Sequence, residues 1–200
     1  MRYNGVSLYS FRLLRFETDR VLKELQFVGG SYGTSSKYSP AFKVEDAFRH
    51  NGDAYLPTGK DANGNGALSV PFPHLIWYDF KYAVLPGRVS FRPRHDKACG
   101  DRGFWCGATK WQFIGTNDEV CDQNSAWTIL CEDLSGRPFE RSRQSKYCEV
   151  ERSVQGAFKC LGISVLDSSH DGSYSCVSIS GVRMWERMAD FDKYDMKNCN

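Results

Sequence analysis

The fold is constrained most strongly by the stretch from residue 75 to residue 96, which reads LIWYDFKYAVLPGRVSFRPRHD. It contains two apolar strand patterns in direct succession, and in the second of them apolar and polar residues alternate. This alternation places Val89 and Phe91 on one face of a strand, with polar residues on the other. The Pro86-Gly87 pair predicts a turn between the two patterns. We therefore expect two strands, followed by a loop that presents Arg94 to Asp96.

Other short segments show a strand pattern, and few show a helical one. Strands are predicted over residues 7–16, 110–114, 126–130, 157–166 and 174–186, and either a strand or a short helix over 20–28. Short strands at this spacing are typical of an all-β sandwich or jelly roll. Gly181 is expected to form a bulge, because the alternation changes phase there. One helical turn is predicted near Glu45 and Asp46, after Ser39-Pro40.

Polar segments between these patterns predict loops. Residues 31–40 and 133–146 are expected to be surface connections, and residues 97–109 a second loop after the opening stretch. Residues 50–74 contain repeated Gly, Pro, Asn and Asp, which predict successive turns. Loops of this length in compact domains are often functional or poorly ordered.

Size and charge exclude several classes of protein. The chain has 200 residues, enough for one all-β domain with a full core. Its net charge is +2, so nucleic acid is not an expected partner. No apolar run approaches the length of a membrane span. The N-terminal sequence also lacks the apolar core of a secretory signal, so a secreted protein would be present here in a mature or trimmed form.

The cysteines point to an oxidising compartment. All eight follow residue 98, and we expect disulfides among Cys99, Cys106, Cys121, Cys131, Cys148, Cys160, Cys176 and Cys199. Free thiols in a cytosolic protein are the alternative. The connectivity cannot be deduced from sequence, but Cys99 with Cys106 and Cys121 with Cys131 are the local pairings that we expect. A zinc site is disfavoured, because the chain has no Cys-x-x-Cys pair and its histidines are scattered.

The order of four segments resembles the discoidin domain, which is also known from the C-terminal domains of coagulation factors. Residues 47–56 (AFRHNGDAYL) resemble the family's Ala-Phe-Asp-Gly-Asn-x-x-Thr-x-Trp segment, and residues 75–80 (LIWYDF) its Trp-Ile-x-x-Asp-Leu strand. Residues 89–96 resemble its Val-x-x-x-Pro-Arg-x-Asp, and residues 113–130 its Ser-Asn-Asp…Trp-x-x-Leu. The resemblance implies a galactose-binding-like β-sandwich, which bacterial carbohydrate-binding modules share.

The resemblance also implies a division of the chain. The discoidin-like sandwich would span residues 27–188. Residues 1–26 would form an N-terminal extension that packs on the domain or precedes it, and residues 189–200 a C-terminal tail.

Departures from the family pattern disfavour its structural calcium. Arg49, His50 and Ala54 stand where the family has Asp, Gly and Thr. A calcium site requires anionic and carbonyl oxygens, and an arginine opposes the cation electrostatically. The remaining candidate ligands are Asn51, Asp53 and Glu186.

The resemblance places ligand binding in loops at one end of the strands, and implies that the segments 53–63, 94–106 and 119–126 gather there. These supply Tyr55 and Trp105 as aromatic surfaces, Arg94 and His95 as donors, and Asp53, Asp96 and Asn124 as acceptors. Sugars are bound by such combinations of flat apolar faces and planar polar groups. The family's sugar binders often use the arginine that Arg94 matches, but their partner asparagine is missing, because Cys99 stands near that place.

Structural roles remain open for the same residues. The alternative role of Arg94 is a salt bridge with Asp96 or another acid. The alternative role of Trp105 is packing against the segment from Cys99 to Cys106. For Trp77, Trp111 and Trp127, packing in the core or on a sheet is the expected role.

The sequence therefore predicts a non-catalytic, secreted or extracellular module that binds a glycan, in the manner of a lectin. No catalytic motif such as Gly-x-Ser-x-Gly or His-Glu-x-x-His is present. The alternative is a protein-interaction module in cell adhesion or the extracellular matrix. Binding of anionic phospholipid ranks lower, because the long loop carries little positive charge.

Overall fold

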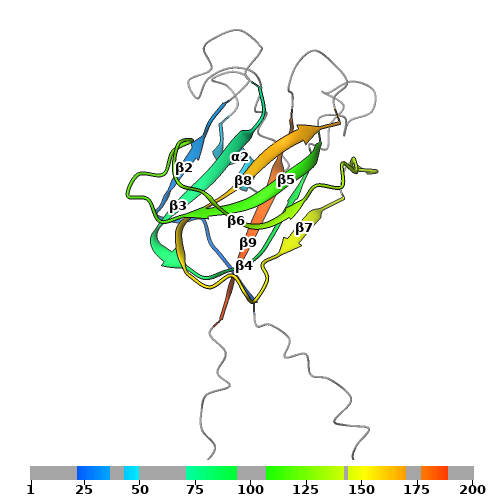
Figure 1. Cartoon of the computed structure of the whole chain (residues 1–200). Coiled ribbons are helices and arrows are strands. Elements are labelled where there is room, and N and C mark those ends of the chain that lie inside the picture. The colour runs from blue at the N-terminus through cyan, green and yellow to red at the C-terminus, as the bar shows by residue number, and fades with distance from the viewer. Residues whose placement is uncertain are drawn as a thin grey trace, which may run out of the picture.

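The computed structural model describes residues 22–36, 43–49, 71–93, 107–141, 144–169 and 177–188, which build a sandwich of two antiparallel sheets (Figure 1). The four-stranded sheet has the order β1 (Leu22–Glu24), β9 (Ser180–Arg187), β4 (Pro86–Arg92), β7 (Lys146–Glu149). The five-stranded sheet has the order β2 (Ser31–Thr34), β3 (His74–Val84), β8 (Phe158–Ser168), β5 (Ala108–Thr116), β6 (Thr128–Asp133). The expected all-β sandwich is confirmed.

The core lies between the two sheets and follows the predicted alternation. Val89 and Phe91 of β4 are fully buried, as are the residues of β8 that alternate inward. The two sheets meet through Phe91 and Trp111 of β5, whose rings lie 4.8 Å apart, edge to face. Edge-to-face pairing is a favourable geometry for aromatic rings, so this contact helps to fix the spacing of the sheets.

The chain changes sheets between β3 and β4, and here the predicted Pro-Gly turn is wrong. Strand β3 ends at Val84 and β4 begins at Pro86, so Leu85 alone separates them. Pro86 is the first residue of its strand, where a missing N–H is tolerated. Gly87 also lies inside β4. A Cβ at this position would stand only 2.6 Å from Cδ2 of Leu22 in β1, so a larger residue would not fit. Gly87 thus permits close packing rather than a turn.

Most of the other predicted elements are confirmed. The patterns at 110–114, 126–130 and 157–166 correspond to β5, β6 and β8, and residues 20–28 contain the short strand β1. The helical turn is α2 (Glu45–Phe48). Gly181 has a φ of 56°, and the register between β4 and β9 shifts beside it, which confirms the bulge. Strand β9 itself begins at residue 180, later than predicted.

Two strands were not predicted. Residues 31–34, expected to be a surface loop, form β2 at one edge of the five-stranded sheet, and β7 follows the connection expected over 133–146. Both are four-residue edge strands with partly exposed side chains, so neither carries a clear apolar alternation. The predicted strand at 7–16 and most of the predicted loops at 50–74 and 97–109 lie outside the described residues.

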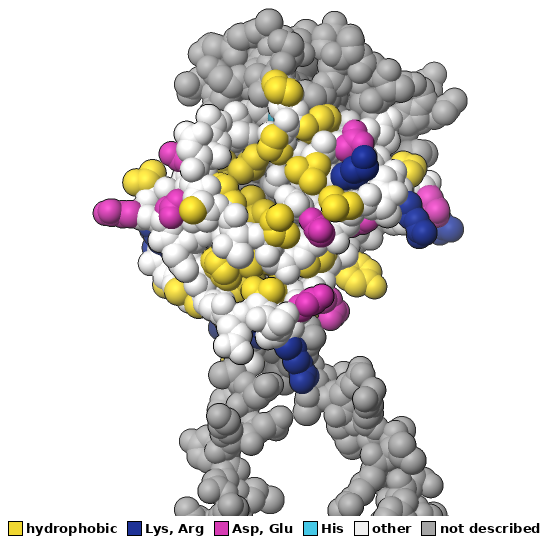
Figure 2. Space-filling view, viewed as in Figure 1, with side chains coloured by type: hydrophobic (Ala, Val, Ile, Leu, Met, Phe, Trp, Pro, Cys, Tyr) yellow, Lys and Arg dark blue, Asp and Glu magenta, His cyan; other side chains and the backbone are white. Residues whose placement is uncertain are grey.

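The outer face of the five-stranded sheet carries a second apolar cluster. Leu75, Trp77 and Ile114 are buried there, and Trp127 of the β5–β6 connection packs against them, with its ring 5.9 Å from that of Trp77. Hydrophobic side chains accordingly gather over this sheet in Figure 2. The packing roles expected for Trp77, Trp111 and Trp127 are confirmed. Within the described part of the chain, no helix has the length and apolar character needed to cross a membrane.

Candidate functional site

One end of the sandwich, which we call the rim, borders two of the three segments predicted to bind ligand, 53–63 and 94–106. Three pairs of described segments are tied together there. Ser36 Oγ lies 2.8 Å from His74 Nδ1 at the β2–β3 border. The Ser169 N–H donates to the Gly107 carbonyl at 3.0 Å. The borders of the segments 37–73 and 94–106 are therefore held at the same end of the two sheets (Figure 1).

The third tie fixes the chain directly before Arg94. Ser180 at the start of β9 is buried, and its hydroxyl donates to the Pro93 carbonyl at 3.0 Å. Pro93 itself is buried. The point at which the chain leaves β4 toward Arg94 is thus held by a hydrogen bond from the neighbouring strand.

His74 was not expected at the rim. Its side chain is almost fully buried, and its ring lies 4.7 Å from that of Phe72. The sequence showed only scattered histidines, and the serine that contacts His74 is 38 positions away. Only the pairing of β2 with β3 brings the two together, and β2 was not predicted.

Six of the seven predicted ligand residues lie outside the described residues. They are Tyr55, Asp53, Arg94, His95, Asp96 and Trp105. Asn124 is described, exposed, and located in the connection that follows Thr116. Thr116 and Ala108 are the two ends of β5, about 27 Å apart at the usual rise of a strand. The structure therefore anchors the Asn124 segment at the end of β5 opposite to the rim.

Of the three candidate calcium ligands, Glu186 is described, whereas Asn51 and Asp53 are not. Glu186 forms an ion pair with Lys23 of β1, with 3.2 Å between Oε1 and Nζ. Directly after α2, the guanidinium of Arg49 lies 3.4 Å from the Asp46 carboxylate. A cationic side chain therefore accompanies both carboxylates.

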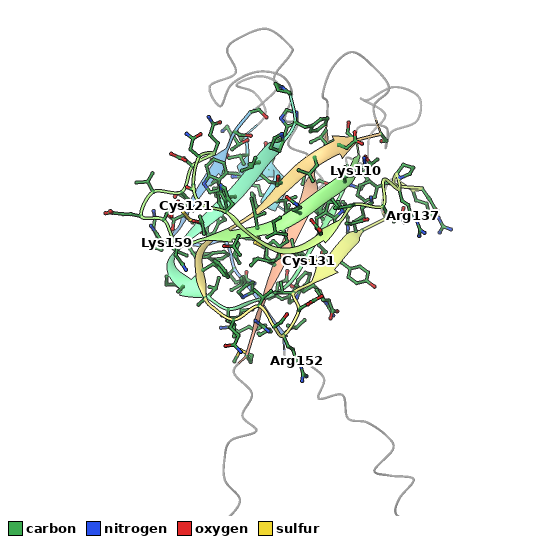
Figure 3. All side chains as sticks on the ribbon, viewed as in Figure 1. Lys110, Cys121, Cys131, Arg137, Arg152 and Lys159 are labelled. Atoms are coloured by element: carbon green, nitrogen blue, oxygen red, sulfur yellow. A yellow bond between two sulfur atoms is a disulfide. The ribbon has the colours of Figure 1, made fainter. Side chains whose placement is uncertain are left out.

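Among the residues that the structure describes, two disulfides join segments that are distant in the sequence. Cys131 of β6 is bonded to Cys148 of β7, and Cys121 of the β5–β6 connection is bonded to Cys160 of β8. The predicted pairing of Cys121 with Cys131 is wrong, because Cys121 is bonded to a residue of β8 in the same sheet, whereas Cys131 is bonded to a residue of β7 in the other sheet. Figure 3 shows Cys121 and Cys131 well separated on the five-stranded sheet. Cys99, Cys106, Cys176 and Cys199 lie outside the described residues.

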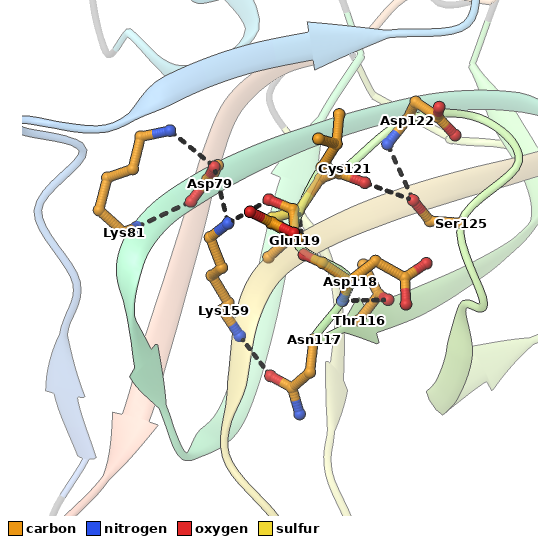
Figure 4. The surroundings of a disulfide bond; sticks show 12 residues. Asp79, Lys81, Thr116, Asn117, Asp118, Glu119, Cys121, Asp122, Ser125 and Lys159 are labelled. Carbon is orange, nitrogen blue, oxygen red and sulfur yellow. Dashed lines mark hydrogen bonds and ion pairs between the residues drawn. A yellow bond between two sulfur atoms is a disulfide. The ribbon is translucent and has the colours of Figure 1, made fainter.

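A buried carboxylate lies beside the second of these disulfides (Figure 4). Asp79 of β3 accepts hydrogen bonds at 2.8 Å from both the backbone N–H and the ammonium of Lys81, and the Lys159 ammonium lies 3.7 Å away. Burial acts to raise the pKa of Asp79, but the hydrogen bonds and charges of the two lysines outweigh it and hold the pKa below its usual value.

This carboxylate does not form a metal site with the nearby sulfurs. An oxygen of Asp79 and the sulfurs of Cys121 and Cys160 lie within 4.8 Å of one another. The two sulfurs are bonded to each other, so neither is a thiolate that could bind a metal. The carboxylate is already neutralised by Lys81 and Lys159. The group is therefore structural, and it stabilises β3 beside the disulfide, where the register of this strand shifts.

Several solved structures with the same fold are carbohydrate-binding modules. A family 32 module of NanJ from Clostridium perfringens, solved with galactose, matches with a TM-score of 0.58 and 13% identity, over 83% of this chain and all of that one (100%). A second family 32 module from Clostridium perfringens, in complex with GalNAc-β-1,3-galactose, matches with a TM-score of 0.57 and 10% identity, over 81% of this chain and 99% of that one. A fragment of a putative chitobiase from Bacteroides thetaiotaomicron matches with a TM-score of 0.58 and 14% identity, over 84% and 94%.

No family profile matches this sequence, and no curated protein is significantly similar to it in sequence. At such low identities, the structural similarity establishes the fold. The chain has the galactose-binding-like β-sandwich of family 32 carbohydrate-binding modules, which discoidin domains share. The expected fold is confirmed, and the finer assignment to discoidin domains stays a prediction.

Proposed function

We propose that this chain is a non-catalytic, extracellular module that binds a glycan through loops at the rim. The observation that carries the proposal is the hydrogen bond from Ser180 to Pro93, which holds the start of the segment leading to Arg94 at the end of two central strands, β4 and β9. A binding loop needs such a rigid support, because ordering a free loop on binding costs affinity. The fold adds support, since family 32 modules with this architecture were solved with galactose and with GalNAc-β-1,3-galactose.

The two disulfides support an extracellular location, because such bonds persist in oxidising compartments. The module would require no metal of its own for sugar binding through Arg94 and Trp105. The ligand class would be glycans with an apolar C–H face, and galactose and N-acetylgalactosamine are the first candidates to test.

The test is a glycan array, followed by calorimetric titration of the best ligand. Replacing Arg94 or Trp105 with alanine should weaken binding at least about tenfold, equivalent to about 1.4 kcal/mol. Matched controls are Arg152→Ala and Tyr82→Ala, which remove an exposed arginine and an exposed tyrosine away from the rim. Figure 3 shows Arg152 at the end opposite to the rim. Failure of every glycan to bind the wild-type protein would contradict the proposal.

A protein-interaction module is the second candidate, favoured by exposed apolar side chains. Ile129 of β6 stands opposite Ile114 of the apolar cluster and is 50% exposed, and Val120, next to Cys121 of the same cluster, is 72% exposed. Such surfaces occur at protein interfaces. Capture of a protein partner that survives enzymatic deglycosylation, together with an empty glycan array, would favour this function over glycan binding.

A further inference from the structure

The outer face of the four-stranded sheet carries a groove that the proposed rim site does not use. Its walls come from three adjacent strands, because Arg88 of β4 stands opposite Trp185 of β9 and Glu149 of β7. Two residues further along β4, on the same face of the sheet, Ser90 stands opposite Tyr147 of β7. These side chains face outward, since the residues that alternate with them are buried in the core.

The hollow follows from a small residue between large ones. Ser90 is flanked along β4 by two arginines and across the sheet by Tyr147, so its short side chain leaves space. The groove has a volume of about 340 Å³, which lies at the lower end of the range for ligand sites. Its lining residues are Arg88, Ser90, Ser145, Tyr147, Glu149 and Trp185.

Two aromatic side chains give the groove flat apolar surfaces. Tyr147 is 67% exposed, so the face of its ring is accessible to a ligand. Trp185 is partly buried, and the guanidinium carbon of Arg88 lies 5.9 Å from the centre of its ring. Aromatic side chains that combine an apolar face with a polar edge are suited to ligands that present both kinds of surface.

The polar groups are held in place and balanced in charge. The Arg88 guanidinium donates to the Glu149 carboxylate at 2.6 Å, and Arg92 Nε donates to the Ser145 hydroxyl at 3.0 Å. Arg183, on the same face, pairs with Glu24 at 3.7 Å. The arginine and glutamate side chains each offer planar arrays of donors or acceptors. Because the two charged residues that line the groove, Arg88 and Glu149, neutralise each other, the lining itself does not favour an anion.

These features together point to a neutral, polyhydroxylated ring as the ligand. A sugar ring presents an apolar C–H patch to an aromatic face, and hydroxyl groups that both donate and accept hydrogen bonds. Tyr147 and Trp185 match the first surface, and the Arg88–Glu149 pair with Ser90 and Ser145 matches the second. An acidic peptide would have to compete with Glu149 for Arg88, which disfavours it.

We propose that the groove lined by Arg88, Tyr147, Glu149 and Trp185 is a second saccharide-binding site, separate from the rim. Ser180 at the rim and Trp185 in the groove are five residues apart on β9, or about 17 Å at the usual strand rise. One short sugar therefore does not occupy both. An open groove across three strands accommodates an internal stretch of a saccharide chain, whereas loops at a strand end suit a chain terminus.

The test is a nuclear magnetic resonance titration of the full chain labelled with ¹⁵N. The probes are neutral hexasaccharides of β-linked glucose, xylose, mannose and galactose, with hexaglutamate as the anionic comparison. We expect at least one saccharide to shift the indole signal of Trp185 and the amide signals of Ser90 and Tyr147. Absence of these shifts with every saccharide, or shifts with hexaglutamate alone, overturns the proposal.

Variants separate this site from the proposed function. Tyr147→Ala and Glu149→Gln should each weaken saccharide binding at the groove at least about fivefold, while the matched control Tyr82→Ala leaves it unchanged. Arg94→Ala should leave the Trp185 shift intact even if it abolishes binding at the rim. Loss of the Trp185 shift in Arg94→Ala, or equal weakening in Tyr82→Ala, shows that the groove is not an independent site. Failure of the rim proposal alone would leave the Trp185 response in place.

Discussion

At the scale of single residues, Asp79 shows how charge and burial are combined in this sandwich. Its carboxylate is 8% exposed but has Lys81 and Lys159 as partners. Lys81 also adopts a positive φ of 65°, which is uncommon for a residue other than glycine. The hydrogen bond from the Lys81 N–H to Asp79 supports that conformation. One carboxylate thus stabilises both an irregular point of β3 and the ammonium of the neighbouring strand β8.

Replacing Asp79 with asparagine should lower the free energy of unfolding at pH 7 by about 1–3 kcal/mol, because charge-assisted hydrogen bonds are lost at a buried position. The pKa of Asp79 is lowered by folding, so its stabilising effect is present above its unfolded pKa of about 3.9. It is lost as the pH falls through the still lower pKa of the folded state. The difference between wild type and variant should therefore shrink below about pH 3.

Urea unfolding at pH 7 and at pH 2.5 measures this difference. Asp167→Asn is the matched control, since Asp167 pairs with Lys110 at 3.5 Å and both side chains are about half exposed. An exposed pair of this kind contributes about 0–1 kcal/mol. An Asp79→Asn variant as stable as the Asp167→Asn variant at pH 7 would refute the role assigned to Asp79.

At the scale of elements, the sequence predicts strands well where one face is buried and poorly elsewhere. Leu161, Ile163 and Val165 alternate in β8 and are all fully buried, as expected. Strand β2 lacked such a pattern because Gly33 has no side chain, and a Cβ there would lie 2.1 Å from Cε2 of Trp77. The reason for this glycine lies on another strand, so no local pattern indicates it.

The disulfide connectivity could not be predicted either, because the partner of each cysteine lies on a strand that is distant in the sequence. Cys131 and Cys148 lie on β6 and β7, the last strands of the two sheets, so their bond closes one edge of the sandwich. Local spacing favoured Cys121 for Cys131, but the pairing depends on which sheet each strand joins. Strand β7 contains that partner cysteine and was itself not predicted.

Removing the edge disulfide should loosen β6 and β7 before the rest of the fold. We expect Cys131→Ala with Cys148→Ala to lower the free energy of unfolding by about 2–4 kcal/mol, as for other natural disulfides. Hydrogen exchange followed by mass spectrometry should show faster exchange in both strands. The control is Cys121→Ala with Cys160→Ala, which should instead expose residues 117–127. Unchanged exchange in β7 after loss of the first bond would contradict this role.

The segment after α2 allows a test of metal dependence. Arg49 ends this element with its guanidinium beside Asp46, and Glu186 pairs with Lys23. We therefore expect no stabilising calcium at the Asn51, Asp53 and Glu186 candidates. Thermal unfolding should occur at the same temperature in 1 mM EDTA and in 5 mM CaCl₂. Calcium at about 100 times its Kd would add about 2.7 kcal/mol, which corresponds to several degrees and would contradict this expectation.

At the scale of the whole molecule, the core and the hydrogen bonds of the rim hold the fold, whereas the residues proposed to bind a glycan at the rim lie in other segments. The hydrogen bonds at the rim fix where the predicted binding segments leave the sheets, while the core contact between Phe91 and Trp111 holds the sheets together. The alternation of apolar and polar residues in β4 predicted which side chains of this strand, Val89 and Phe91, lie in the core. It could not predict the groove, because Arg88, Tyr147 and Trp185 come together only through the register of three strands that are distant in sequence.

The disulfides limit the number of free thiols in the whole protein. Because Cys121, Cys131, Cys148 and Cys160 are bonded in pairs, at most four of the eight cysteines should react with iodoacetamide in denatured, unreduced protein. The same protein after reduction should react at all eight, which serves as the control. Disulfides constrain the unfolded chain, so reduction should also lower the midpoint of urea unfolding. Eight reactive thiols without reduction would place the native protein in a reducing compartment and remove the main support for an extracellular module.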